Sequence, residues 1–413
     1  MTNKKNALLS CRRDVSVLIA LIGIYPLQTW ADADGGRDPV RANEVLGLSV
    51  TQALRYDSNV FRLADDTSTA MTSQAGQRHD FISTTTLRAG VDKDFGRNHI
   101  FLLAAPSIIR YARFSDLDYI GQDFLGDLVG RLGTNGHYGV NYEHVKVATD
   151  PADQVVPTGN TATSDRLGFD LAVPAGPRWQ AVTGWRADRT RNSSETEQGG
   201  DNHGWAADAG VRFLPASGNN IDLRYRHSRY DYPNIIPSTL ADNSYSQNEI
   251  ELSGNVQIDD PSRLEGRVSY VRREHDNFAE RNFSGMVGAL KYLWRPTVAT
   301  SITTSIFKDI GAVTDSSASY AKSYGISIQP LWDATAKIAL GTLVEWRRRT
   351  YSGFAIDEPR APEHTTRVGL SAHYMATRNW QLGFDVSDER RRSSAAAQNY
   401  SDVISNLTAQ WKM

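Results

Sequence analysis

Apolar and polar side chains alternate at every second position in one segment after another of this chain. In the first such segment, residues 46–56, the apolar side chains Leu46, Leu48, Val50 and Leu54 share one parity, with Gln52 as the polar exception. The pattern recurs at 166–173, 221–228, 249–256 and 380–387. Period two is the repeat of a β-strand whose two faces meet different surroundings. Counting such segments predicts about 18 strands, an even number, as in single-chain bacterial barrels.

The connections between these segments also alternate in kind. Short turns fall at 96–98, 133–136 and 174–177, whereas long polar loops fall at 148–163 and 191–203. Short turns at one end and long loops at the other are typical of a membrane barrel, and a soluble β-sandwich has no such asymmetry. A barrel of about 18 strands encloses a lumen too wide for side chains to fill. The sequence therefore predicts an all-β fold, a transmembrane up-and-down antiparallel β-barrel with its apolar parity toward lipid.

Two of the predicted strands, 98–112 and 281–294, alternate poorly, and the direction in which their side chains face stays open. The tryptophans give separate support for a membrane barrel, because indole prefers the headgroup level of a bilayer. Most of them are expected close to strand ends: Trp179, Trp294, Trp332, Trp380 and Trp411 beside short turns, and Trp185, Trp205 and Trp346 toward the long loops.

The first 31 residues have the features of a signal peptide. A basic stretch precedes the apolar run of residues 15–27, and small residues follow, with Ala31 at the expected cleavage point. The run is shorter than the ~20 residues that a membrane-spanning helix needs. We expect a signal peptide at 1–31, a short periplasmic segment at 32–45 and the barrel at 46–413, located in the outer membrane of a Gram-negative-type cell.

Composition and motifs exclude several classes of function. The chain has 45 basic and 47 acidic residues, a net charge of −2, which argues against a nucleic-acid partner. Its one cysteine, Cys11, lies in the predicted signal peptide, so no disulfide or thiolate metal site is expected. DADGG (32–36) and FSDLD (114–118) resemble calcium-ligand spacing but complete no binding loop. With no catalytic motif in the sequence, we predict no enzymatic activity, no metal and no cofactor.

Charged residues gather on the inward parity of the strands between 177 and 273. The candidates for lining a channel are Arg178, Arg186, Arg212, Arg224, Arg226, Arg263, Arg267, Arg273, Asp208, Asp222, Glu249 and Glu251. Such a wall could bind hydroxyl and carboxylate groups of a sugar through charge-assisted hydrogen bonds. It could equally be a network of ion pairs that stiffens a water-filled lumen. The excess of arginine favours an anionic solute.

A second set of cations lies on the outward parity, where the rising strands reach the long loops. Its members are Lys146, Arg189, Arg229, Arg272, Lys308, Arg348 and Arg390. One interpretation is a rim that pairs with lipopolysaccharide phosphates, since anionic headgroups attract cations. The other is that these residues only mark the level at which the strands meet water.

The chain resembles the EpsL-type outer-membrane proteins of exopolysaccharide biosynthesis clusters, within a broader group of β-barrel porins. The resemblance rests on YDSNVFRL (56–63), the turns LWRPT (293–297) and PLWDAT (330–335), and the cysteine-free barrel. It implies that the protein exports or helps to assemble a secreted polysaccharide. The chain departs from the usual aromatic end of such barrels, which the barrel-assembly machinery recognises, because Lys412 and Met413 follow Trp411.

Three functions are compatible with these observations. The first is passive export or assembly of an exopolysaccharide, which would require a separate periplasmic partner because residues 32–45 are too few for a scaffold. The second is a general or solute-selective porin. The third is a plugged barrel with a structural or lipid-modifying role. In each case outer-membrane lipids and lipopolysaccharide would surround the barrel.

Overall fold

The computed structural model describes residues 46–64, 77–153, 159–215, 218–235, 243–312, 320–352, 361–395 and 398–413. The predicted signal peptide (1–31) and periplasmic segment (32–45) lie outside the described residues. In the described part of the chain, no helix has both the length and the apolar character needed to cross a bilayer.

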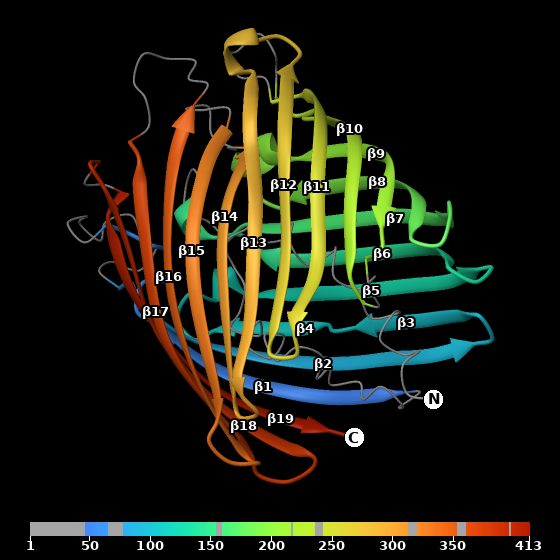
Figure 1. Cartoon of the computed structure of the whole chain (residues 1–413). Coiled ribbons are helices and arrows are strands. Elements are labelled where there is room, and N and C mark those ends of the chain that lie inside the picture. The colour runs from blue at the N-terminus through green and yellow to red at the C-terminus, as the bar shows by residue number, and fades with distance from the viewer. Residues whose placement is uncertain are drawn as a thin grey trace.

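About three quarters of the described residues belong to antiparallel strands, most of them long (Figure 1). The strands are β1 (Gly47–Asp57), β2 (Asp80–Phe95), β3 (Asn98–Ala104), β4 (Ser107–Tyr111), β5 (Tyr119–Leu132), β6 (Gly136–Ala148), β7 (Thr161–Pro174), β8 (Trp179–Asn192), β9 (Asn202–Phe213), β10 (Asn220–Asp231), β11 (Tyr245–Asp259), β12 (Ser262–His275), β13 (Phe283–Thr297), β14 (Thr300–Ala312), β15 (Tyr320–Asp333), β16 (Ile338–Ser352), β17 (Glu363–Met375), β18 (Trp380–Ser393) and β19 (Tyr400–Lys412). The described parts of the loops contain four short 3-10 helices: η4 (Ser115–Leu117), η5 (Pro151–Asp153), η6 (Glu195–Gly200) and η7 (Ala279–Arg281).

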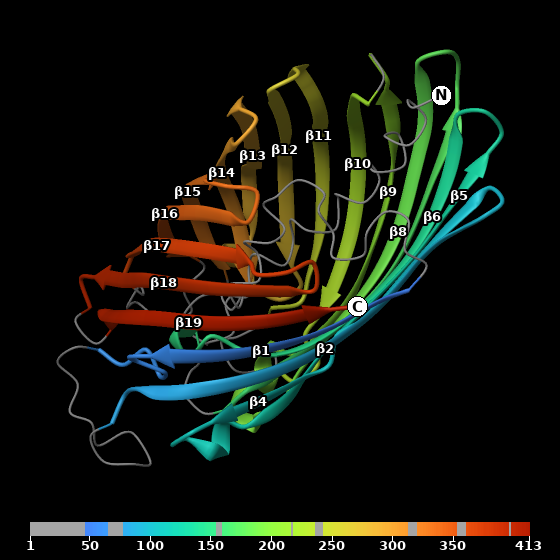
Figure 2. The same ribbon diagram turned by 90° about the horizontal axis from the view of Figure 1, so that it is seen from below.

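The sheet closes on itself. Each strand pairs with its neighbours in sequence, and β1 pairs with both β2 and β19, from Ser49↔Lys412 to Asp57↔Ile404. Figure 2 shows β1 and β19 side by side. Closure removes the sheet edges, which is necessary in a bilayer because lipid offers the backbone no hydrogen-bond partner.

Strands β3 and β4 form one barrel strand, interrupted between Ala104 and Ser107. Both pair with β2 on one side and with β5 on the other, in an unbroken register. The interruption contains Pro106, which has no N–H to donate to the ladder. Nineteen segments therefore make eighteen barrel strands, and the predicted fold class and strand number are confirmed.

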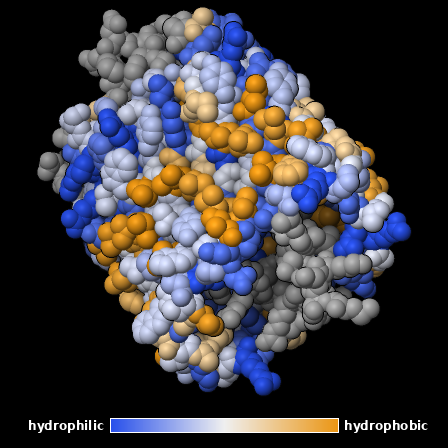
Figure 3. Space-filling model, in the orientation of Figure 1, coloured by the Kyte–Doolittle hydropathy of each residue, from blue (hydrophilic) through white to orange (hydrophobic). Residues whose placement is uncertain are grey.

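The apolar parity lies on the outer surface. In β1, Val50 and Leu54 are 37% and 47% exposed, whereas Ser49 and Asp57, on the other parity, are 5% and 2% exposed. Figure 3 shows apolar side chains gathered across the outer face of the visible strands. An apolar surface of this extent is unfavourable in water and favourable against hydrocarbon.

The two poorly alternating strands also direct one parity outward and the other inward. They differ from the other strands in carrying apolar residues on both faces. In the strand at 98–112, Leu102 and Ile108 face outward while Phe101 and Leu103 are buried inside. In β13, Met286 faces outward and is 48% exposed, whereas Phe283 and Val287 are buried. Local apolar clusters on the inner face therefore explain the weak alternation.

Tryptophans occupy strand ends next to the short turns. Trp179 and Trp380 begin β8 and β18, and Trp332 is the penultimate residue of β15. Trp185 and Trp346 depart from the predicted placement because they lie near the middle of β8 and β16. The aromatic belt is therefore better defined at the short-turn end, which we call the periplasmic end, than at the long-loop end, which we call the outer end.

Candidate functional site

The predicted channel-lining residues of β8–β12 lie on the inner face of the barrel. Their parity is opposite to that of outward side chains such as Trp185, Leu223 and Ile250, which are 43%, 49% and 55% exposed. The inner set comprises Arg186, Asp208, Arg212, Asp222, Arg224, Arg226, Glu249, Glu251, Arg263, Arg267 and Arg273. Arg178 is the exception, because β8 begins one residue later and Arg178 is exposed in the preceding turn.

Ion pairs between adjacent strands organise this wall. Arg212 on β9 lies 2.7 Å from Asp222 on β10, measured from Nη2 to Oδ2. Arg224 reaches the same oxygen at 3.1 Å and Asp208 at 2.9 Å. Asp222 is 3% exposed, so its charge is compensated almost entirely by these two guanidinium groups. This part of the wall fits the predicted stiffening network.

Arg226 is held more loosely than its neighbours. Its nearest carboxylate oxygens, on Asp208, Glu249 and Glu251, lie 3.6–3.7 Å away, beyond ordinary hydrogen-bond distance. Its guanidinium is therefore held by no short ion pair to these carboxylates.

The ionic network continues onto strands that the sequence did not single out. Arg166 on β7 bridges Asp188 at 2.7 Å and Glu143 at 3.1 Å, and Arg186 pairs with the same Asp188 at 2.8 Å. The Tyr230 hydroxyl also donates to Asp188. Inward parity on β6 and β7 was the signal that could have identified Arg166 and Glu143.

At the outer end, residues 58–63 fold back toward the interior of the barrel, since Arg62 in this turn pairs with Asp57 and Asp402 on the inward parity of β1 and β19. The Asn59 side chain clamps this turn, accepting from the Leu63 amide and donating to the Leu63 carbonyl. Val60, Phe61 and Leu63 pack against Phe114, which is completely buried. The YDSN motif therefore marks the end of β1, and the chain then turns inward.

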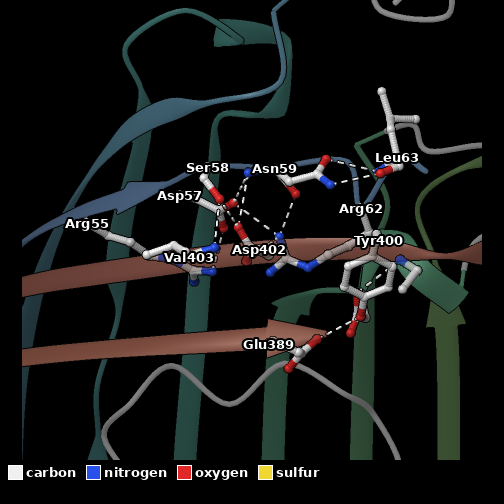
Figure 4. A network of polar contacts seen from close by, with 12 residues as sticks. Arg55, Asp57, Ser58, Asn59, Arg62, Leu63, Glu389, Tyr400, Asp402 and Val403 are labelled. Carbon is white, nitrogen blue, oxygen red and sulfur yellow. Dashed lines mark hydrogen bonds and ion pairs between the residues drawn. The ribbon is translucent and has the colours of Figure 1, made fainter. Parts of the chain in front are cut away.

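Arg62 is the centre of the polar contacts in Figure 4. Its Nη1 lies 3.1 Å from Asp57 and 2.8 Å from Asp402, which joins the first and last barrel strands. Burial by itself lowers the pKa of the Arg62 guanidinium, but the carboxylates of Asp57 and Asp402 outweigh it and hold that pKa well above its usual value. Arg62 therefore stays charged and acts as an ionic clamp.

The loop between β6 and β7 also enters the outer mouth. Its Ala152 carbonyl accepts a hydrogen bond of 3.1 Å from Arg391 on β18, which is not a sheet neighbour of β6 or β7. An added Cβ at Gly159, later in this loop, would lie 3.0 Å from Leu117 in η4. Three loops, after β1, β4 and β6, thus narrow the outer mouth from one side.

The predicted rim cations differ in their partners. Arg229 lies 2.6 Å from Asp276, Arg272 lies 2.6 Å from Glu274, and Arg390 lies 2.7 Å from Asp388. No ion pair with a described carboxylate is observed for the remaining four, although Asp165 lies directly opposite Arg189 in the register of β7 and β8. These four are Lys146, Arg189, Lys308 and Arg348.

A closed barrel of eighteen strands with an apolar outer belt and a charged inner wall defines a class: this is a porin-like β-barrel of the outer membrane. The family described as "Putative beta-barrel porin 2" matches residues 241–412, a region that includes β11 to β19. No curated protein matches the chain.

Solved structures agree on the fold. Pseudomonas aeruginosa OccK2 (OpdF) is similar with a TM-score of 0.50 and 11% identity, over 89% of this chain and 97% of that one. Pseudomonas aeruginosa OccK9 (OpdG) has a TM-score of 0.50 and 10% identity, over 89% and 98%. A porin architecture agrees with the prediction that this chain is not an enzyme.

Proposed function

We propose that this protein is a passive, solute-selective porin for small polar solutes that carry hydroxyl and carboxylate groups. The observation that carries the proposal is Arg226, a lumen arginine surrounded by three carboxylates at 3.6–3.7 Å. A solute carboxylate can accept from this guanidinium, while its hydroxyl groups donate to Asp208, Glu249 or Glu251. The short ion pairs around Arg212 and Arg224 keep the wall in place.

The test is single-channel conductance in planar bilayers, with and without glucuronate as an acidic sugar and glucose as the neutral control. We expect steady ion flow that glucuronate reduces more strongly than glucose does. A barrel without conductance would overturn the proposal and favour the plugged structural role.

Export of an exopolysaccharide is the second candidate, supported by the resemblance to EpsL-type proteins. A polymer chain would have to displace the loops that narrow the outer mouth, including the contact between Arg391 and Ala152. This candidate also requires a periplasmic partner to deliver the polymer. Block by a long acidic oligosaccharide, with no block by glucuronate, would favour export over the porin.

We also propose that the outer rim binds lipopolysaccharide through the four cations that form no ion pair with a described carboxylate, Lys146, Arg189, Lys308 and Arg348. Lipid phosphates can pair with these cations without displacing an existing ion pair. Arg229, Arg272 and Arg390 already have such partners and are expected to contribute less.

A further inference from the structure

The hydrogen-bonded ladder between β13 and β14 ends before the strands do. The two strands pair from Thr297↔Thr300 up to Gly288↔Lys308. Beyond this point β13 continues to pair with β12 as far as Phe283, and β14 continues to pair with β15 as far as Ala312. The barrel wall therefore contains a seam at its outer end, between two strands that each keep their other neighbour.

Side-chain packing shows how the wall is arranged at this seam. Ile310 and Tyr320 lie on the parity that faces outward lower in β14 and β15, where Ile306 and Ile326 are exposed. Here, however, they are buried together with residues of the inward parity of β12 and β13. This seam cluster comprises Val271, Phe283, Val287, Ile310 and Tyr320. The outer ends of β14 and β15 therefore lie on the lumen side of β12 and β13, so that the two pairs of strands overlap at the seam.

Asp309 holds the seam at its lower end. Its Oδ1 accepts the backbone amide of Ile310 at 2.8 Å, which supplies an acceptor where the ladder with β13 has stopped. Its Oδ2 lies 3.4 Å from the Arg267 guanidinium on β12. One carboxylate thus links the two sides of the seam.

Two buried polar groups beside the cluster have no hydrogen-bond partner among the described residues. They are Nε of Arg267 and Oγ of Ser269, and Ser269 is only 1% exposed. Both residues share the inner face of β12 with Val271 of the seam cluster, two residues further along the strand. The Arg267 Nε and the Ser269 hydroxyl could both donate hydrogen bonds to a carboxylate head group. The seam cluster lies next to them along the strand and could contact an aliphatic chain attached to that head group.

We propose that the seam between β13 and β14 is a lateral gate for amphipathic carboxylates such as fatty acids. The solute carboxylate replaces that of Asp309 on Arg267 and hydrogen-bonds to Ser269, and its aliphatic chain inserts among the seam cluster. Loss of the Asp309 contact releases the outer ends of β14 and β15, and the lumen then opens sideways at the level of the rim cation Lys308, where the ladder ends. This route is separate from the conduction of small polar solutes along the barrel axis.

The test is photolabelling of the protein in lipid bilayers by a dodecanoic acid that carries a diazirine on its chain. We expect label on Val271, Phe283 and Val287. Arg267→Gln should reduce this labelling at least fivefold, whereas Lys291→Gln should leave it within twofold. Lys291 is a matched control because it lies on the inner face of β13 below the seam.

A disulfide across the seam provides an independent test of the gate. A disulfide in Val287→Cys/Ile310→Cys should close the seam and suppress labelling, and reduction should restore it. Leu290→Cys/Ile306→Cys joins the same two strands below the seam, where these residues are register partners, and should have no effect. Labelling confined to outward residues such as Met286, or labelling unchanged by both Arg267→Gln and the seam disulfide, would overturn the proposal. Glucuronate-sensitive conductance should persist in the disulfide form, so failure of the gate is distinguishable from failure of the porin proposal.

Discussion

At the scale of single residues, the arginines of this barrel fall into two kinds. Arg62 and Arg212 are held by short ion pairs to carboxylates that are themselves buried. Arg226 has neighbours at 3.6–3.7 Å, and its side chain is 20% exposed. The first kind stabilises the structure, because removing one partner leaves a buried charge uncompensated. The second kind is available to a solute.

Arg62→Gln should lower the stability of the barrel. Removing the guanidinium leaves the buried Asp402 without its ion-pair partner and leaves Asp57 with Arg55 alone, at a cost of about 3–5 kcal/mol. Arg110→Gln is the matched control: Arg110 is 57% exposed and 3.4 Å from Asp118, so about 0–1 kcal/mol is expected. The measurement is the free energy of unfolding in urea in lipid vesicles. Equal losses in the two variants would contradict the clamp.

Arg226→Gln should weaken glucuronate binding in the pore about ten- to a hundredfold, because a charge-assisted hydrogen bond contributes about 1.5–3 kcal/mol. Ion conductance itself should persist. Arg191→Gln, on the outward parity of β8 and 53% exposed, should leave block unchanged. Titration of the blocked fraction of the current against glucuronate concentration gives both affinities. An unaltered affinity in Arg226→Gln would place solute recognition elsewhere.

At the scale of strands and loops, the sequence was most informative where each face met one environment. The alternation at 221–228 predicts β10 within a few residues, because lipid and water select opposite side chains at successive positions. It was weakest at 98–112 and 281–294, where Phe101 and Phe283 are apolar on the inner face as well. Those inner contacts are made with strands or loops distant in sequence, which local periodicity does not encode.

Two further features could not be predicted from the sequence: which loops fold inward, and which charged residues pair with each other. The contact of Arg391 with Ala152 joins residues 239 positions apart. The predicted lumen charges lie on the inner wall apart from Arg178, but the strand register alone does not decide which arginine gains a short ion pair. Asp208, for example, lies opposite Arg226 in the register, yet it makes its short contact with Arg224.

Replacing residues 150–158 by two glycines should widen the outer mouth, because this segment contributes Ala152 to the contact with Arg391. Since pore diameter limits ion flow, single-channel conductance should rise about twofold or more. Shortening the η6 loop at Glu195–Gly200 provides the control, and no increase is expected there. An unchanged conductance in the first variant would mean that the loop does not limit flow.

Substituting by glutamine the four rim cations that form no ion pair with a described carboxylate should reduce the lipopolysaccharide that co-purifies with the barrel. The substituted residues are Lys146, Arg189, Lys308 and Arg348. The control variant replaces Arg229, Arg272 and Arg390, whose carboxylate partners compete with lipid phosphates. Phosphate analysis of the purified protein measures the loss. Equal retention of lipopolysaccharide by both variants would contradict the proposal and mean that these cations only mark the level at which the strands meet water.

At the scale of the whole molecule, one geometrical arrangement supports each proposal made above. Eighteen strands close with one parity toward hydrocarbon and the other toward a wet lumen. The pore, the outer rim and the seam are each defined by their position on this cylinder. If the two faces were exchanged, Arg226 would face lipid and Leu223 would face water, and no transport proposal would survive.

The direct test compares adjacent positions on one strand in a lipid bilayer. Spin labels are attached to Leu252→Cys and Ser253→Cys on β11, and to Ile306→Cys and Ser305→Cys on β14, where Leu252 and Ile306 are 48% and 44% exposed. We predict that labels at 252 and 306 collide with lipid-soluble oxygen, and that labels at 253 and 305 collide with a water-soluble nickel chelate. Equal access of both reagents at neighbouring positions, or the reverse pattern, would contradict the barrel's two-faced wall.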